Sequence, residues 1–312
     1  MLLVSAGPRS PPDARENWGD RSMLAFLIPV KHPANSRSYS RVTDLLRLTL
    51  TSIERQTMRP IGIHVVCNEV PEWAHGFPDV DFIEVDFPPA RLPTDSADIY
   101  QWIYRDKGCK IAIALDRARH NGATHIMATD ADDFVSCRLA EHVATNPDIP
   151  GWYFPTGIRY SSLFKIFDIQ HEFWTYCGTS HIVRTELLPH TPHFDIRPTQ
   201  EDIVSCFDPD ILNHVLGDHV NWRHYFSTLG HPLEPLPFHG AVWHTDTGDN
   251  SSRAWFGQRR FGPVWGKPVG PEQAVEFGLP LEKRPIHVSA LLYSWRLRSL
   301  VRRIFNRTMP QQ

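Results

Sequence analysis

Three aspartates stand within four residues of one another, at Asp130, Asp132 and Asp133, with Ala131 between the first two. They directly follow residues 125–129, a short apolar run that is typical of a buried strand. Clustered carboxylates repel one another, and burial adds a desolvation cost. A divalent cation removes both penalties, and carboxylates with substrate phosphates are the ligands that Mg²⁺ or Mn²⁺ favours. The cluster therefore predicts a divalent-cation site. The alternative is that Asp130 caps a turn beside two solvated acids.

The segments around the cluster predict an α/β fold. Apolar runs typical of buried strands occur at residues 23–30, 61–67, 80–85 and 125–129. Apolar residues at helical spacing predict helices over residues 41–56, 110–119 and 218–229. Strands that alternate with helices in this way indicate a mostly parallel central sheet with helices on both faces. Ligands of such sheets bind at the carboxyl ends of the strands. Lys31, Asn68 and Glu69 follow two of these ends, as the aspartates follow a third.

The composition narrows the functional class. The 312 residues include 32 Lys and Arg against 35 Asp and Glu, a net charge of −3, so we do not expect nucleic acid as a partner. Five cysteines, an odd number without a C-x-x-C pair, favour a reducing compartment, and we expect a cytoplasmic protein. No apolar run reaches the roughly 20 residues that cross a bilayer.

Several motifs in the first half resemble those of family 2 glycosyltransferases of the GT-A fold. They are residues 24–30, the helix at 41–56, residues 64–69 and residues 127–133. The resemblance implies a single GT-A domain over residues 23–285, with a nucleotide-binding half at 23–133 and a loop-rich acceptor half at 134–285. It also implies that the donor is bound by Pro29, Val30, Lys31, Asn68, Glu69, Lys107, Lys110, Asp130, Ala131 and Asp132.

Two segments of the second half carry the same resemblance. Residues 216–222, followed by Gly230, resemble the segment that supplies the catalytic base, so the resemblance implies Asp218 or His219 in that role. The nearby Asp202, in a literal Glu-Asp pair, stays open as an alternative base. Residues 241–252 resemble the aromatic–x–His segment of the family, which adds His244 to a metal site made by Asp130, Asp132 and Asp133.

These motifs together predict a metal-dependent hexosyltransferase of polysaccharide biosynthesis, with Mn²⁺ or Mg²⁺ as cofactor. A sugar would pass from a nucleotide diphosphate donor to the hydroxyl of a glycan or lipid-linked acceptor, with inversion. The base rate within the family favours UDP as the nucleotide. We expect Asp218 to be the base, at the N-terminus of the helix at 218–229, where the helix dipole keeps a carboxylate ionised. An N-cap role for Asp218 is the alternative.

Five aromatic residues of the second half have two possible roles. They either offer flat faces on which sugar rings stack or simply belong to the core: Trp152, Tyr153, Trp174, Tyr176 and Trp222.

The two ends of the chain have distinct composition. Residues 1–22 are rich in Pro, Arg and Asp and predict a flexible tail. Residues 286–312 predict a basic amphipathic helix with five arginines between Tyr293 and Arg307. Such a helix either lies peripherally on an anionic membrane, here the inner face, or covers the domain's own core.

Two other functions compete with glycosyl transfer. A sugar nucleotidyltransferase shares the α/β layout, but it would need a glycine-rich loop with Arg or Lys straight after the first strand, and residues 27–33 contain no glycine. A non-catalytic glycan- or protein-binding module on a degenerate transferase fold is the other alternative. The four intact acids, Asp130, Asp132, Asp133 and Asp218, disfavour such decay.

Overall fold

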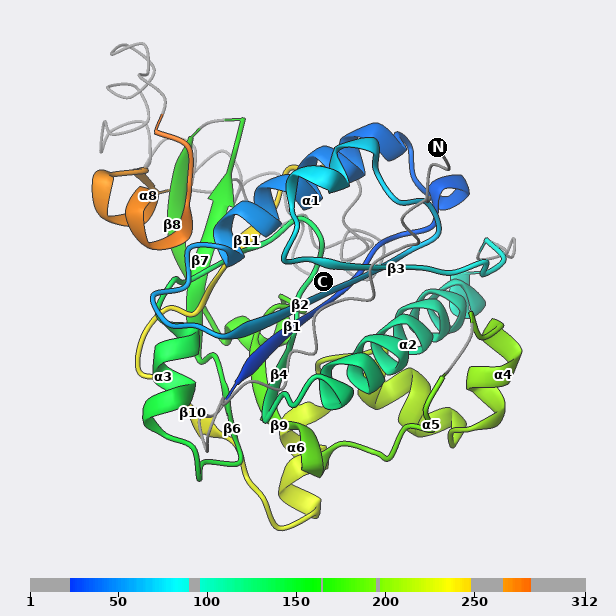
Figure 1. The fold of residues 1–312 in the computed structure, drawn as a ribbon. Coiled ribbons are helices and arrows are strands. Elements are labelled where there is room, and N and C mark those ends of the chain that lie inside the picture. The colour runs from blue at the N-terminus through cyan, green and yellow to red at the C-terminus, as the bar shows by residue number, and fades with distance from the viewer. Residues whose placement is uncertain (1–22, 90–95, 164, 195–196, 248–265, 282–312) are drawn as a thin grey trace, which may run out of the picture.

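A computed structural model describes residues 23–89, 96–163, 165–194, 197–247 and 266–281 of the chain (Figure 1). The predicted tail at 1–22 and the predicted C-terminal helix at 286–312 lie outside the described residues, and so does the end of the 241–252 segment. Within the described ranges, no helix has both the length and the apolar character that a membrane span requires.

A seven-stranded sheet forms the centre of the molecule. Its strands, in spatial order, are β10 (Glu234–Pro235), β6 (Gly151–Tyr153), β9 (His181–Arg184), β4 (His125–Ala128), β1 (Leu24–Pro29), β2 (Ile61–Cys67) and β3 (Asp81–Glu84). β9 runs antiparallel to both of its neighbours, and every other neighbouring pair is parallel. The predicted mostly parallel sheet is confirmed, and β2 has the bounds expected from the sequence.

Helices cover both faces of this sheet (Figure 1). One face packs against α1 (Tyr39–Ile53) and α3 (Leu139–Thr145). The opposite face packs against α2 (Ser96–His120), α4 (Gln200–Ser205), η5 (Leu212–Leu216) and α6 (Trp222–Thr228), with the short α5 (Pro209–Ile211) between α4 and η5. This arrangement is the α/β class predicted from the sequence, and it is consistent with a single domain of the GT-A type.

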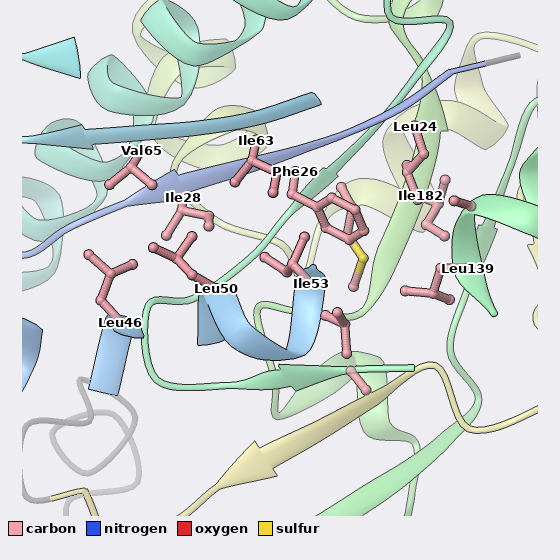
Figure 2. Close-up of a cluster of buried hydrophobic side chains, with 14 of the residues drawn as sticks. Leu24, Phe26, Ile28, Leu46, Leu50, Ile53, Ile63, Val65, Leu139 and Ile182 are labelled. Atoms are coloured by element: carbon pink, nitrogen blue, oxygen red, sulfur yellow. The ribbon is translucent and has the colours of Figure 1, made fainter. Parts of the chain in front are cut away.

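The side chains of β1 alternate between the two faces, as the two-residue period of a strand requires. Leu24, Phe26 and Ile28 point toward α1 and α3, whereas Ala25 and Leu27 belong to the cluster under α2. Figure 2 shows Leu46, Leu50 and Ile53 of α1 meeting the first set. Because β1 is buried on both sides, its run is apolar throughout.

The second half of the chain adds a second sheet, where the sequence indicated a loop-rich half without strands. The strand order is β12 (Lys267–Pro268), β8 (Ile166–His171), β7 (Thr156–Ser161), β11 (Ala241–His244) and β5 (Phe134–Val135). A small apolar cluster joins this sheet to α8 (Pro271–Phe277). The remaining short elements are η1 (Pro33–Asn35), η2 (Glu72–Gly76), η3 (Phe173–Thr175) and η4 (Thr185–Leu187).

Two glycines let α2 and η5 approach each other to backbone contact. A Cβ atom on Gly108 would overlap the carbonyl oxygen of Leu212, and one on Gly217 would overlap the carbonyl oxygen of Tyr104. Both contacts are with backbone atoms, which cannot turn aside as a side chain can. The two glycines therefore fix the distance between α2 and the chain that follows η5.

We expect Gly108→Ala to destabilise the protein, although alanine is the better helix former by about 1 kcal/mol. The new methyl group forces α2 away from η5, and overpacking of this kind costs about 1–3 kcal/mol. After the gain in helix propensity is subtracted, the net loss in free energy of unfolding should be about 1 kcal/mol, measured by urea denaturation. Gly76→Ala is the matched control, because nothing lies within 4 Å of its added Cβ. Equal stability of the two variants would contradict the close approach.

Candidate active site

The carboxyl ends of the parallel strands bring the predicted donor-binding residues to one edge of the sheet. Pro29 of β1 lies opposite Val66 of β2, and Leu27 lies opposite Ala128 of β4. The residues that follow these strands therefore share this edge: Val30 and Lys31, Asn68 and Glu69, and the segment from Asp130 to Asp133. β9 begins and β6 ends at the same edge, because Tyr153 pairs with His181.

Asp130 is paired with a lysine of α2. The Lys107 Nζ atom lies 2.6 Å from Asp130 Oδ1. Burial would raise the pKa of Asp130, but the charge and hydrogen bond of Lys107 outweigh burial and lower it. The backbone amide of Gly178 also donates to this carboxylate, and a Cβ at position 178 would overlap it. Asp130 is therefore ionised in the folded protein, with Lys107 as its counter-ion.

Asp132 faces the chain that follows β11. Its Oδ2 accepts a hydrogen bond of 2.9 Å from Thr247 Oγ1. Burial raises the pKa of Asp132 to about 6, and the charge of Asp130 adds to this rise. Because two of its three main influences disfavour the charged form, Asp132 would gain from a cation or another positive group nearby.

Asp133 is a structural residue of the loop rather than an open carboxylate. Its Oδ2 accepts hydrogen bonds from Thr179 Oγ1 (2.7 Å) and Cys177 Sγ (3.1 Å), and its Oδ1 accepts one from the backbone amide of His244 (3.2 Å). The side chain is 2% exposed, and burial, with the neighbouring charges of Asp132 and Asp130, raises its pKa. Asp133 thus joins β4, the 177–179 segment and β11.

His244 is buried at the end of β11 and lies beside Asp246, with 3.2 Å between its Nε2 and Asp246 Oδ1. Asp246 also accepts hydrogen bonds from Ser161 Oγ, Ser162 Oγ and the backbone amides of Ser162 and Leu163. These contacts join β11 to the end of β7, and they orient His244 toward Asp246.

Asp218 and His219 lie in the turn between η5 and α6, at the same edge as Lys107. The prediction that Asp218 begins a helix is wrong, because α6 starts at Trp222 with Asn221 as its N-cap. Instead, Asp218 Oδ1 accepts a hydrogen bond from the amide of Val220, which closes the turn. Asp218 is near enough to Lys107 for its charge to help raise the pKa of Lys107.

His219 is neutral at neutral pH. Burial and the charge of Lys107 lower its pKa to about 4, against the opposing charges of Asp218 and Asp130. Among the described residues, no group hydrogen-bonds to its Nε2 atom. Both predicted candidates for the base thus stand beside the pair of Lys107 and Asp130.

Asp202, the other candidate for the base, has a structural role. It is the third residue of α4, and its carboxylate accepts hydrogen bonds from the amide and the hydroxyl of Thr199. Thr199 Oγ1 in turn accepts from the amide of Asp202, which completes a capping box. The Glu-Asp pair therefore marks the start of a helix.

Lys110 is buried beneath the edge where a donor would bind, and its ammonium is already hydrogen-bonded within the protein. Its side chain is 0% exposed, and Nζ donates to the carbonyl oxygen of Val30 and to Asp106 Oδ2, both at 2.8 Å. Lys110 thus fastens α2 to the end of β1. Asn68 also makes a contact within the protein: its Nδ2 donates to the carbonyl oxygen of Phe87, which connects the residues that follow β2 and β3.

The predicted metal ligands do not form a site made by the protein alone. Asp133 is fully hydrogen-bonded within the loop, Asp130 is paired with Lys107, and His244 lies against Asp246. Across the described ranges, no three His, Cys, Asp or Glu side chains are grouped as a metal centre. Asp132 is the ligand that fits a cation best, which suits a cation that substrate phosphates bind on its other side.

Sequence reasoning missed the residues that organise the acids. Thr179, Gly178 and Thr247 hold Asp133, Asp130 and Asp132, respectively. The glycine and hydroxyl residues at 178–180 follow an aromatic stretch, which is the one local signal of a close backbone approach there. Of the predicted sugar-stacking aromatics, Trp152 and Trp222 are buried in the core, whereas Tyr153, Trp174 and Tyr176 are half-buried.

No protein-family model matches the chain, and no curated protein matches it. Among solved structures, it resembles a protein from Desulfovibrio desulfuricans G20 assigned as a nucleotide-diphospho-sugar transferase, at 12% identity over 72% of this chain and 81% of that chain, with a TM-score of 0.34. Bifunctional IspDF from Campylobacter jejuni matches at 14% identity over 72% of this chain and 49% of that chain, with a TM-score of 0.34. Rv0371c from Mycobacterium tuberculosis H37Rv matches at 12% identity over 75% of this chain and 97% of that chain, with a TM-score of 0.36. The residues of the chain itself therefore carry the functional assignment.

We expect Lys110→Met to destabilise the fold by about 2–4 kcal/mol, because it leaves the Asp106 carboxylate and the Val30 carbonyl without their buried donor. Urea denaturation of the purified protein measures this loss. Adding Asp106→Leu should restore part of it, since the unpaired acid is then removed as well. A single variant as stable as the wild type would show that Lys110 is free to serve a ligand.

Proposed function

We propose that this protein is a glycosyltransferase of the GT-A type that moves a hexosyl group from a nucleoside diphosphate sugar to an acceptor hydroxyl. UDP is the nucleotide we would test first, and a glycan or lipid-linked acceptor is the partner. The observation that supports this most is the meeting of Lys107, Asp130, Asp132 and Asp218 at the carboxyl edge of a parallel sheet. That edge is where α/β sheets bind nucleotides.

The donor side of the site lies on the first half of the chain. Pro29, Val30 and Lys31 follow β1, and Asn68 and Glu69 follow β2, so this part of the edge suits the base and ribose. Lys107 brings a positive charge close to Asp130, where the diphosphate would lie. Its ammonium can pass from the carboxylate to a phosphate oxygen without leaving the site.

The departing nucleoside diphosphate accumulates negative charge, which the site must stabilise. Asp132, with Asp130 beside it, would hold a Mn²⁺ or Mg²⁺ ion that also binds the diphosphate and offsets this charge. Lys107 contributes a fixed positive charge to the same end. Asp133 and His244 support this geometry from behind through the hydrogen bond between them.

The acceptor hydroxyl must lose its proton as it attacks the anomeric carbon, and Asp218 is the base that we propose. Its Oδ1 is oriented by the amide of Val220, so the carboxylate keeps one direction. A single carboxylate within hydrogen-bond reach is sufficient for this role, and direct attack leads to inversion. His219, neutral and adjacent, either orients the carboxylate or takes the proton itself.

Product analysis distinguishes this function from its two competitors. A glycosyltransferase releases a nucleoside diphosphate from a nucleotide sugar, a nucleotidyltransferase releases pyrophosphate from a nucleoside triphosphate, and a binding module releases neither. We would incubate the protein with UDP-, GDP- and dTDP-sugars and Mn²⁺, and separately with sugar 1-phosphates and triphosphates. Pyrophosphate as the sole product would overturn the proposal in favour of the nucleotidyltransferase.

We expect Mn²⁺ to bind tightly only together with a nucleoside diphosphate, because the protein alone offers it little more than Asp132. Calorimetric titration of Mn²⁺ into the protein, with and without UDP, measures this difference. Asp132→Asn should remove the Mn²⁺-dependent part of UDP affinity, whereas Asp44→Asn, on the exposed side of α1, should leave it unchanged. Wild-type Mn²⁺ dependence in Asp132→Asn would refute this assignment.

Asp218→Asn should lower kcat by about 10²–10⁴ while leaving donor affinity unchanged, because only the proton acceptor is lost. The amide oxygen of asparagine can still accept from Val220, so the turn should persist. Steady-state kinetics with a transferable donor, together with UDP titration, provide the test. Asp202→Asn is the matched control and should retain full turnover. Normal turnover in Asp218→Asn would move the role of base to His219.

A further inference from the structure

A cavity of about 350 Å³ is lined in part by Val220, which lies two residues after the proposed base Asp218. The other lining residues include Trp174 of η3, Arg223 and Ser227 of α6, and Leu233. Figure 1 shows α6 near β6 and β9, which with β10 form one end of the seven-stranded sheet. A cavity of this size accommodates one sugar residue.

The cavity adjoins the turn that carries the proposed base. Val220 lines it and also donates its amide hydrogen to Asp218. His181, at the start of β9, lies near both His219 and Arg223. A molecule in the cavity would therefore lie near the turn that carries the base.

Arg223 is held in a fixed orientation by two aromatic rings. Its guanidinium carbon is 3.9 Å from the ring centre of Tyr153 and 4.6 Å from that of Trp174. Stacking on ring faces fixes the plane of the guanidinium but leaves its N–H groups, which lie at its edges, able to donate. Both aromatic residues are ones the sequence offered as faces for sugar rings.

No carboxylate neutralises Arg223 among the residues the structure describes. Other arginines over rings do have such partners: Arg138, over Phe238, pairs with Glu276 at 2.6 Å, and Arg105, over Trp102, pairs with Glu201 at 3.5 Å. An oriented guanidinium without an acid, in the wall of a cavity, is arranged to bind an anion in a two-point contact.

We propose that this cavity binds the acceptor sugar and that the acceptor carries an anionic group, a carboxylate or a phosphate, which pairs with Arg223. The proposal rests on the glycosyl transfer proposed above and names the class of its acceptor. Trp174 offers an apolar face for the sugar ring while Arg223 binds the anion, and the hydroxyl to be glycosylated points toward Asp218. Specificity for a charged acceptor would follow, because a neutral sugar leaves the guanidinium unpaired.

The direct test compares matched sugars on the full-length protein. Binding of methyl glucoside, methyl glucuronide and glucose 6-phosphate is measured by calorimetry and by saturation-transfer NMR, with inorganic phosphate as a fourth probe. We expect one or both anionic sugars to bind at least about tenfold more tightly than methyl glucoside, and the advantage to fall as salt rises. The stronger of the two identifies the anion as carboxylate or phosphate. Equal affinity for all three sugars would overturn the proposal.

Variants locate the effect at Arg223. Arg223→Gln should reduce the affinity for the anionic sugars to that for methyl glucoside, while Arg47→Gln, which also faces a ring, at Trp73, should change nothing. If Arg223→Gln fails to fold, Ser227→Asp replaces it, since Ser227 is exposed one turn further along α6 and an acid there would pair with Arg223. Thr228→Asp is its control, because Thr228 is also exposed on α6 but does not line the cavity. Undiminished preference for anionic sugars in the folded variant would refute the assignment.

A parallel titration separates this proposal from the function on which it rests. UDP with Mn²⁺ should bind Arg223→Gln as well as it binds the wild type, because none of the residues that line the cavity is a proposed donor-binding residue. If UDP and the other nucleotides bind no form of the protein, the proposed function fails, although the sugar comparison still decides whether the cavity selects anions. If nucleotides bind and anionic sugars have no advantage, the acceptor class alone is wrong.

Discussion

Three carboxylates in four residues at the end of a buried strand repel one another, and the surrounding fold compensates for that repulsion in a different way for each of them. Lys107 neutralises Asp130, and three hydrogen bonds hold Asp133 within the loop. Asp132 receives one side-chain hydrogen bond, and its pKa stays raised, at about 6. The acid with the least compensation is therefore the one best able to gain from a substrate or a cation.

The position of Lys107 depends on how closely α2 packs against η5. Gly108, its neighbour, lies against the backbone of Leu212, and Gly217, the neighbour of Asp218, lies against the backbone of Tyr104. These contacts bring a lysine and an acid from distant parts of the chain to the same edge. Lys110, one turn further along α2, fixes the helix to the end of β1. Two glycines and a buried lysine thus determine the geometry of the charged groups.

The second sheet completes the site from the opposite side. β11 presents the amide of His244 to Asp133, and Thr247 follows it to reach Asp132. Asp246 connects the same segment to the end of β7 through Ser161 and Ser162. The half of the chain that the sequence indicated as loop-rich therefore supports the acids of the first half, and it also supplies the cavity that Val220 and Arg223 line.

The sequence by itself determined the strands of the first half, the helices on both faces, and the edge of the sheet at which Asp130 and Asp132 lie. Those features follow from the spacing of apolar residues within single segments, which neighbouring residues are sufficient to define. The tertiary structure decided which partner each of Asp130, Asp132 and Asp133 has. It also decided the burial of Lys110, the turn at Asp218 and the stacking of Arg223. Each depends on a partner from another element, such as the amide of His244, 111 residues after Asp133. Such a partner is brought close only when the sheets and helices pack together, and no local pattern of residue types records it.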